Sequence, residues 1–172
     1  MSGWGDVLIK IAFVDGHQVV EIDAPTLAGV NLDDFSLHRA LLENQNLSGA
    51  SFKGADLRGA FLTSAVMSGC NFEEALLMTA FMDDAIIDNA NFYKAKLMST
   101  VFKRAILTNA NFLDADVCHA DFENADLSNA NMECARIGSA SFKNAKYSSK
   151  TQWPMGFDPR EVGAVLVGDG AE

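Results

Sequence analysis

A five-residue repeat runs from residue 30 to residue 149 and restricts the possible folds more than any other feature of the chain. Each block has a bulky apolar centre, and the 24 centres run in steps of five from Leu32 to Tyr147. Alanine stands two residues before the centre in 19 blocks, and Gly, Asn or Asp stands two residues after it in 13. Three positions of each block therefore show the same five-residue period: the centre, the residue two before it and the residue two after it.

Neither an ordinary helix nor an ordinary strand can use this period. Five residues advance about 140° around an α-helix, so the centres would scatter around its axis. Along a straight strand, an odd step moves each successive centre to the opposite face. The chain must therefore bend once per block, where Gly, Asn and Asp tolerate left-handed and turn conformations. Short repeats of this kind predict a solenoid.

The phenylalanines predict how many blocks make one coil. All seven central phenylalanines fall on alternate blocks and form two series with a spacing of 20: Phe52, Phe72, Phe92, Phe112 and, half a coil away, Phe102, Phe122, Phe142. Four asparagines share one 20-residue register and predict a polar ladder: Asn71, Asn91, Asn111, Asn131. Four blocks per coil would give about six coils, and a rod about 29 Å long at about 4.8 Å per coil.

The repeat resembles the Ala-(Asp/Asn)-Leu-X-X pattern of the pentapeptide-repeat family. The resemblance covers about 120 of the 172 residues. It implies an all-β fold, a right-handed quadrilateral parallel β-helix, and the expected handedness rests on the resemblance alone. The segment from Thr151 to Pro159 is similar to the tails that close other proteins of the family.

We expect a single domain, residues 1–172, with three parts. Residues 1–29 form an N-terminal cap and the entry to the first coil, residues 30–149 the β-helix, and residues 150–172 a C-terminal cap and frayed tail. Two β-rich runs flank Asp15-Gly16 and predict a hairpin, which would cover the open end of the solenoid. A helix over Trp4–Ala12 is the alternative.

A short helix is expected in the C-terminal cap. Asp158 has the features of an N-cap, followed by Pro159 at the first helical position and by Glu161. The apolar side of this helix would be formed by Val162, Val165 and Leu166. Two aromatic side chains outside the repeat, Trp153 and Phe157, are expected to anchor this segment on the last coil.

Composition argues against several classes of function. The net charge of −10 does not support direct binding of nucleic acid. No apolar run approaches the 18 residues of a membrane span, and the start of the chain lacks a basic region, so we expect no membrane association and a cytoplasmic location. Cys70 is expected to point inward and Cys118 and Cys134 outward. No metal-ligand, cofactor or catalytic constellation is found, which predicts a protein that is not an enzyme.

The outward positions carry more apolar residues than a solvated surface needs. At 20-residue spacing, three consecutive faces of the coil would carry an apolar belt: Leu41, Phe61, Phe81, Val101; Val66, Ile86, Ile106; and Leu76, Met78, Met98. An apolar patch of this size typically marks an interface, with aromatic anchors. We therefore predict a structural or protein-interaction scaffold that binds an unknown protein partner or forms a homo-oligomer. Alternatively, these β-rich residues only stabilise the stacking of coils.

A second functional interpretation comes from the resemblance. Some pentapeptide-repeat proteins mimic DNA, bind type II topoisomerases such as gyrase, and protect against quinolones. The acidic charge of this chain agrees with that role. The apolar belt and a basic cluster disagree with it, since neither resembles a row of phosphates. The cluster consists of Lys94, Lys96, Lys103 and Arg104.

Overall fold

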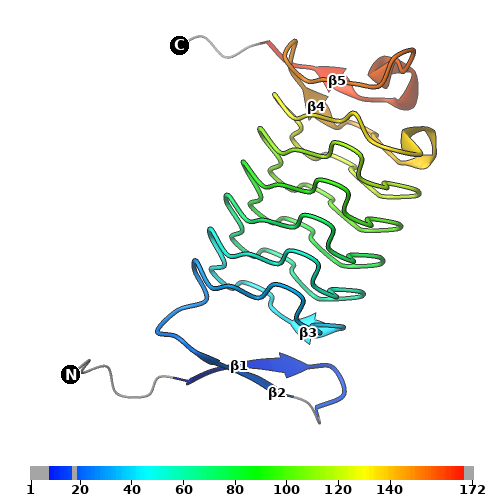
Figure 1. Ribbon diagram of the computed structural model, residues 1–172. Helices are drawn as coiled ribbons and strands as arrows, with labels where there is room; N and C mark the ends of the chain where they lie inside the picture. The colour runs from blue at the N-terminus through cyan, green and yellow to red at the C-terminus, as the bar shows by residue number, and fades with distance from the viewer. Residues whose placement is uncertain (1–7, 17–18, 169–172) are drawn as a thin grey trace.

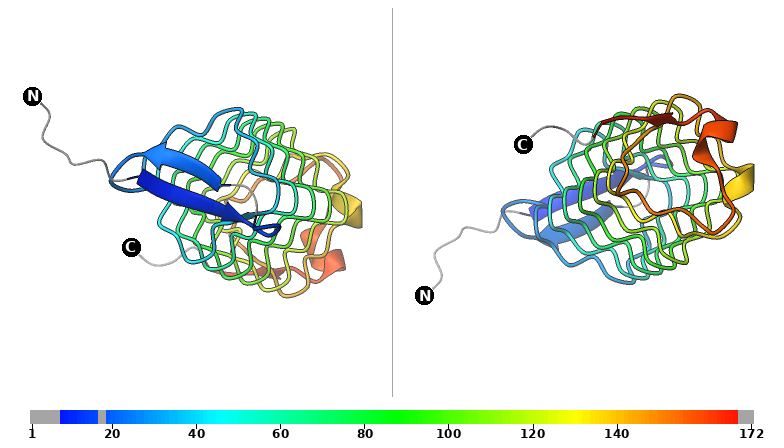
Figure 2. Two further views of the ribbon diagram at one scale, coloured as in Figure 1. Left: turned by 90° about the horizontal axis from the view of Figure 1, so that it is seen from below. Right: turned by 90° about the horizontal axis from the view of Figure 1, so that it is seen from above.

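The computed structural model describes residues 8–16 and 19–168. Its centre is a stack of coils in which the chain bends at every fifth residue (Figure 1). Parallel bridges join residues 20 apart, from Asn31 with Ser51 to Asn111 with Asn131. Seen end-on, successive coils lie over one another (Figure 2). One coil therefore takes 20 residues, as the phenylalanine spacing predicts, and the fold is a repeat β-helix.

The bends are made by residues in the left-handed conformation. Every fifth residue from Asp34 to Asn129 has a positive φ, between 56° at Ser99 and 70° at Gly49. Thr79 and Lys94 adopt it too, although an L-residue pays roughly 1 kcal/mol or more there. Hydrogen bonds between coils hold these residues in place: the amide of Thr79, for example, donates to the carbonyl of Met98 over 3.0 Å. Stacking thus overrides local preference where the repeat lacks Gly, Asn or Asp.

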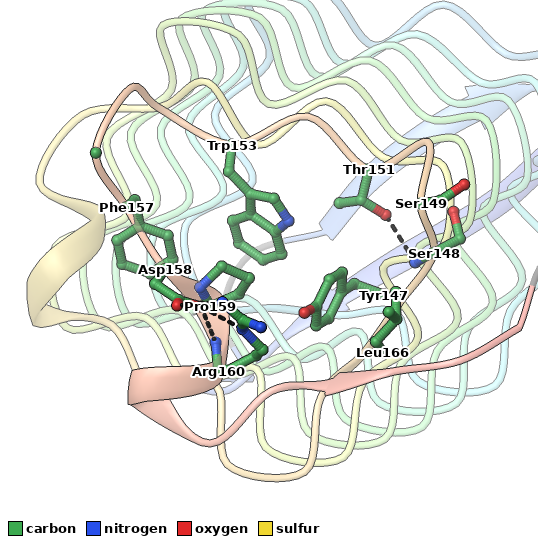
Figure 3. Close-up of a pocket in the computed structure, with 11 residues that line it drawn as sticks. Tyr147, Ser148, Ser149, Thr151, Trp153, Phe157, Asp158, Pro159, Arg160 and Leu166 are labelled. Carbon is green, nitrogen blue, oxygen red and sulfur yellow. Dashed lines mark hydrogen bonds and ion pairs between the residues drawn. The ribbon is translucent and has the colours of Figure 1, made fainter.

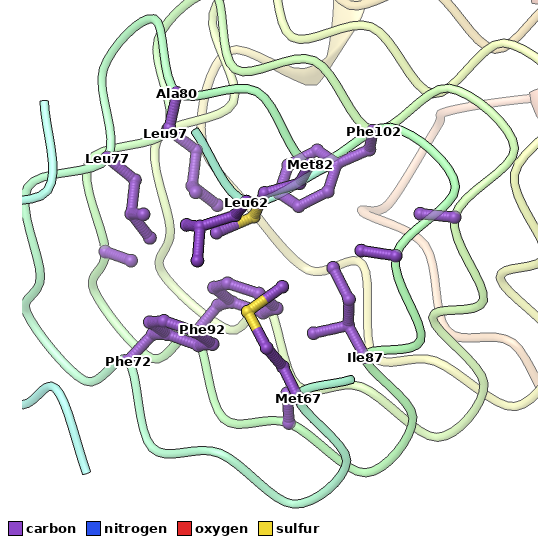
Figure 4. Packing of buried hydrophobic residues seen from close by; sticks show 14 of the residues in the cluster. Leu62, Met67, Phe72, Leu77, Ala80, Met82, Ile87, Phe92, Leu97 and Phe102 are labelled. Carbon is purple, nitrogen blue, oxygen red and sulfur yellow. The ribbon is translucent and has the colours of Figure 1, made fainter. Parts of the chain in front are cut away.

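The interior is filled by the centres and the small residues that precede them (Figure 4). All seven central phenylalanines are fully buried. Phe52, Phe72, Phe92 and Phe112 form one column, with successive ring centroids 4.8–5.1 Å apart. The other three form a second column, and rings of the two columns meet edge to face at 5.8–6.0 Å. The predicted interior columns are confirmed.

An antiparallel hairpin lies at the N-terminal end of the stack. Strand β1 (Leu8–Phe13) pairs with β2 (Val19–Asp23) and, at its other edge, with β3 (Ala40–Leu41) in the first coil. The two strands cross the end of the stack (Figure 2). Ile11 of strand β1 is buried and belongs to the hydrophobic core. Residues 8–12 are therefore strand, and the alternative of a helix is wrong for them. Residues 4–7 lie outside the described part.

The C-terminal segment differs from its prediction in one respect. The Asp158 carboxylate accepts from the amide of Arg160, as expected, and begins the short 3-10 helix η2 (Pro159–Val162). This helix ends at Gly163, and Val165 and Leu166 form strand β5 (Val165–Leu166) instead of its predicted apolar side. The reason is the open edge of strand β4 (Lys146–Tyr147), whose backbone groups need partners. Strand β5 pairs with it in parallel, and both of its residues are exposed.

The predicted register is interrupted once, beside the 3-10 helix η1 (Ile137–Ser139). Asp116 bridges to Ala135 at a spacing of 19, one residue fewer than in the preceding coils. Cys134 takes the inward place of the usual alanine and is buried, so its predicted outward orientation is wrong. A small apolar side chain fits that place. Arg136 makes the left-handed bend instead, and its guanidinium binds Asp116.

Candidate interaction surface

Four apolar residues form one column on the outside of the coil, which we call the aromatic column: Leu41, Phe61, Phe81 and Val101. Backbone bridges join each of them to the next, so their side chains stack along the rod. The rings of Phe61 and Phe81 lie nearly parallel, with centroids 5.2 Å apart. Phe81 is 39% exposed and Leu41 38%, and the other two are half-buried. The column therefore presents a flat apolar strip to solvent.

The next face carries a second column, Val66, Ile86 and Ile106, which we call the aliphatic column. Its members are also joined by successive bridges. Ile86 and Ile106 are exposed to a similar extent as Phe81, while Val66 is half-buried. Bridges join Val66 to Asn46 and Ile106 to Asp126, so a polar residue lies next to the column at each end. Seven apolar residues thus lie on two consecutive faces.

The third predicted group, Leu76, Met78 and Met98, is less continuous. All three side chains are half-buried. Leu76 bridges to Asp56 on one side and to Lys96 on the other, so its column alternates between apolar and charged residues. This group can extend a contact made by the aromatic column, but it forms no strip of its own.

Ion pairs mark the end of the aromatic column. The bridge after Val101 leads to Asp121, whose carboxylate lies 3.1 Å from the Lys103 ammonium. Lys103 and Lys143 both pair with Glu123, and they lower the pKa of that carboxyl. The Arg104 guanidinium likewise lowers the pKa of Asp84. These pairs are at least partly exposed to solvent and contribute little to stability, yet they make a polar rim.

The pairing of the hairpin adds one residue that the sequence reading missed. Strand β1 places Ala12 beside Leu41, and Ala12 is exposed. Ala12 therefore extends the aromatic column by one residue onto the hairpin. The five-residue period could not reveal this, because β1 lies outside the repeat and joins the coil antiparallel.

A hollow at the C-terminal end has a volume of about 580 Å³ (Figure 3). Trp153, Phe157 and Tyr147 line it, and Trp153 packs edge to face on Phe142 of the core, as its anchoring role requires. The one guanidinium in its lining, Arg160, is already paired with Asp158, which lowers the pKa of that carboxyl to about 2.

The remaining candidates for chemistry are dispersed. Within residues 8–16 and 19–168, no group of three His, Cys, Asp or Glu side chains could hold a metal ion. Burial raises the pKa of the Cys70 and Cys134 thiols to about 12, which keeps both neutral. Over the same residues, no helix is long and apolar enough to cross a membrane.

Sequence comparison identifies the class of protein that this coil defines. A family profile described as pentapeptide repeats, with eight copies, matches residues 26–63, 65–104, 85–124 and 105–144. The matches cover most of the chain, and they fall on the stacked coils. The chain belongs to the pentapeptide-repeat family. The search of curated proteins gave no match.

Several solved structures have a similar fold. Two trypsin-treated forms of QnrB1, a plasmid-mediated fluoroquinolone resistance protein, are similar to this chain. One is 19% identical over 85% of this chain and 88% of its own, with a TM-score of 0.57. The other is 18% identical over 81% and 88%, with a TM-score of 0.52. At such identities the likeness shows the fold alone.

A third similar structure is HetL, a pentapeptide repeat protein involved in heterocyst differentiation regulation from the cyanobacterium Nostoc sp. strain PCC 7120. It is 21% identical over 69% of this chain, with a TM-score of 0.45. The matched region spans 60% of the HetL chain, less than two thirds of it.

Proposed function

We propose that this chain is a non-enzymatic scaffold that binds a protein through the apolar belt. The observation that carries the proposal is the stacked pair in the middle of the aromatic column, the exposed Phe81 and the half-buried Phe61. Aromatic residues at the centre of a patch dominate the energetics of protein interfaces. The rigid coil presents them without any loop that must be ordered on binding, which lowers the entropic cost of association.

The surroundings of the pair support an interface. The aromatic and aliphatic columns lie on consecutive faces, and ion pairs such as Lys103 with Asp121 border them. An apolar centre with a polar rim is the usual anatomy of a protein interface. Residues that served only the stacking of coils would not need to leave Ile106 42% exposed.

A pair of double variants tests the proposal. Phe61→Glu with Phe81→Glu should leave the circular dichroism spectrum unchanged and abolish capture of the partner from native lysate. Tyr93→Glu with Leu113→Glu is the matched control, because it adds the same charge at two half-buried positions on the opposite face. The proposal is wrong if both double variants capture the same proteins as the wild type.

We propose the finer features of the fold together with this function. These are a right-handed coil of six turns over residues 30–149, closed by the hairpin and by residues 150–167. The bridge spacing of 20 through most of the coil and the family resemblance support the proposal. A crystal structure with the coil wound left-handed would refute it.

The alternative is a DNA mimic that acts on a type II topoisomerase such as gyrase. The net charge of −10 and the fold shared with QnrB1 favour it. The apolar belt disfavours it, because phosphate-like surfaces are charged throughout. A gyrase supercoiling assay with purified protein discriminates: inhibition or protection at micromolar concentration supports the mimic, and no effect removes it.

A further inference from the structure

The aromatic column has a charged column beside it. Each residue of the aromatic column belongs to a five-residue block whose centre is Leu, Met or Phe, and the residue after that centre is polar. Each of these four blocks therefore presents one apolar and one polar side chain outward, and we call each such pair a rung. From the N-terminal rung to the C-terminal one, the pairs are Leu41 with Glu43, Phe61 with Thr63, Phe81 with Asp83, and Val101 with Lys103. All eight are exposed or half-buried. We call these four rungs the docking face.

We propose that the docking face binds a second copy of this chain, with the two rods antiparallel about a two-fold axis between the Phe61 and Phe81 rungs. This inference rests on the proposed function and identifies the bound protein as a second copy of the chain. An isologous contact of this kind requires a surface that is complementary to itself when reversed. The docking face meets that requirement in both of its columns.

Reversal about this axis pairs apolar residues with apolar residues in one column and acidic residues with residues of different charge in the other. Phe61 meets Phe81 of the second copy, and Leu41 meets Val101, so the apolar column covers itself. In the charged column, Glu43 meets Lys103 of the second copy, and Thr63 meets Asp83. Each charged contact occurs twice in the dimer. Complementary charges of this kind set orientation and register more than affinity.

Three alternative arrangements bring like charges together. An axis through the Phe81 rung places Asp83 against its own copy, and an axis through the Phe61 rung places Glu43 against Asp83. A parallel arrangement with the aromatic columns aligned places Asp121 against itself, since this residue follows Val101 in the bridge series. Charge repulsion therefore disfavours these three arrangements. An axis between the Phe81 and Val101 rungs would pair Asp83 with Lys103, but it would place Phe61 against Asp121, so the apolar column disfavours it.

Glu43 is the most informative residue of the face. Within the described residues it has no ion-pair partner, whereas Lys103 lies 3.1 Å from Asp121 and 3.3 Å from Glu123. In the proposed dimer, Glu43 at one end of the docking face therefore meets Lys103 at the other end of the second copy's face. The four rungs span only about 14 Å, at about 4.8 Å each, so the interface is small. Interfaces of that size are weak, and the measurements must reach high protein concentration.

The test is sedimentation equilibrium of purified full-length chains from about 1 µM to 1 mM. The wild type should dimerise with concentration. Glu43→Lys and Lys103→Glu should each weaken the dimer by about tenfold or more, because each reverses two symmetric contacts. An equimolar mixture of these two variants should form heterodimers, since each then presents the charge that the other lacks. Circular dichroism confirms that each variant is folded.

Ile86→Glu is the matched control for Phe81→Glu. Ile86 lies on the next face of the coil and is 38% exposed, against 39% for Phe81. Phe81→Glu should abolish the dimer and Ile86→Glu should leave it intact. The inference is overturned by a wild type that stays monomeric at 1 mM, by variants that do not associate when mixed, or by equal effects of the two glutamates. A monomer whose Phe61 and Phe81 still bind another protein would overturn this inference alone and leave the proposed function standing.

Discussion

Two phenylalanine stacks in this protein have almost the same geometry and different surroundings. Inside the coil, Phe72 and Phe92 stack at 4.9 Å, and outside it Phe61 and Phe81 stack at 5.2 Å. The inner pair is fully buried, while Phe81 is 39% exposed. Stacking therefore follows from the 20-residue register on either side of the backbone. The buried rings stabilise the fold, whereas the exposed ring can contact another molecule. Substitutions in the two stacks should therefore differ in their effects on stability and on binding.

The largest expected effect is in the interior. Phe92→Ala removes a ring that stacks on Phe72 and Phe112 and meets Phe102 edge to face. The cavity lies in the middle of the stack, where the coils above and below cannot close it. We expect a loss of about 3–5 kcal/mol in the free energy of unfolding. Urea denaturation measures it, and a loss below about 1 kcal/mol would contradict a packed core.

The asparagine ladder should contribute less. The Asn91 side chain donates to Asn71 over 3.1 Å and accepts from Asn111 over 3.0 Å. Asn91→Ala leaves both neighbours short of a partner, and we expect a loss of about 1–2 kcal/mol. The control is Asn46→Ala, whose side-chain oxygen accepts only from Ser48. Equal losses in urea denaturation would show that the ladder adds nothing.

The outer pair should affect the stability of the fold little. Phe81→Ala removes the exposed ring and its stacking on Phe61, and we expect a loss of about 1 kcal/mol or less. The same substitution should strongly weaken association through the docking face. Urea denaturation and sedimentation of one preparation measure both quantities. A loss as large as that of Phe92→Ala would place the outer pair among the structural rings.

The smallest expected effect is a loss of thermal stability at low pH. Burial disfavours ionisation of Asp116, but hydrogen bonds from Arg136 and from the Cys118 amide outweigh it and lower the pKa. Ion pairs with Arg104 and with Lys143 and Lys103 likewise lower the pKa values of Asp84 and Glu123, respectively. Because these folded-state values lie below the unfolded ones, the stability that they provide is present above about pH 4.5 and is lost as pH falls through the lowered values. The thermal midpoint should therefore fall progressively below about pH 4.5.

Arg136→Gln provides the control for that acid loss. It removes the guanidinium that binds Asp116, and it should make the fall in thermal midpoint shallower on acidification. An unchanged pH profile would show that this pair contributes nothing to the acid sensitivity.

The repeat itself was sufficient to predict the coil, the interior phenylalanine columns and the apolar outer positions, because each depends only on the period and on which side of the backbone a residue lies. Cys134 was placed wrongly for the same reason: a fixed period assumes that no corner shortens by a residue. Val165 and Leu166 were placed in a helix because their partner, the open edge of β4, cannot be seen in local sequence. Ala12 was missed because the pairing of β1 with β3 joins segments outside a common period.

The sequence by itself determined the period, and with it the side of the wall on which each repeated residue lies. That follows because alanine and large apolar side chains at fixed offsets can be buried together only if the chain bends every five residues. Only the tertiary structure decided how the two ends depart from the period and how much of each outward ring stays exposed. These depend on which backbone edges and neighbouring coils are available, as with Phe61 under Phe81.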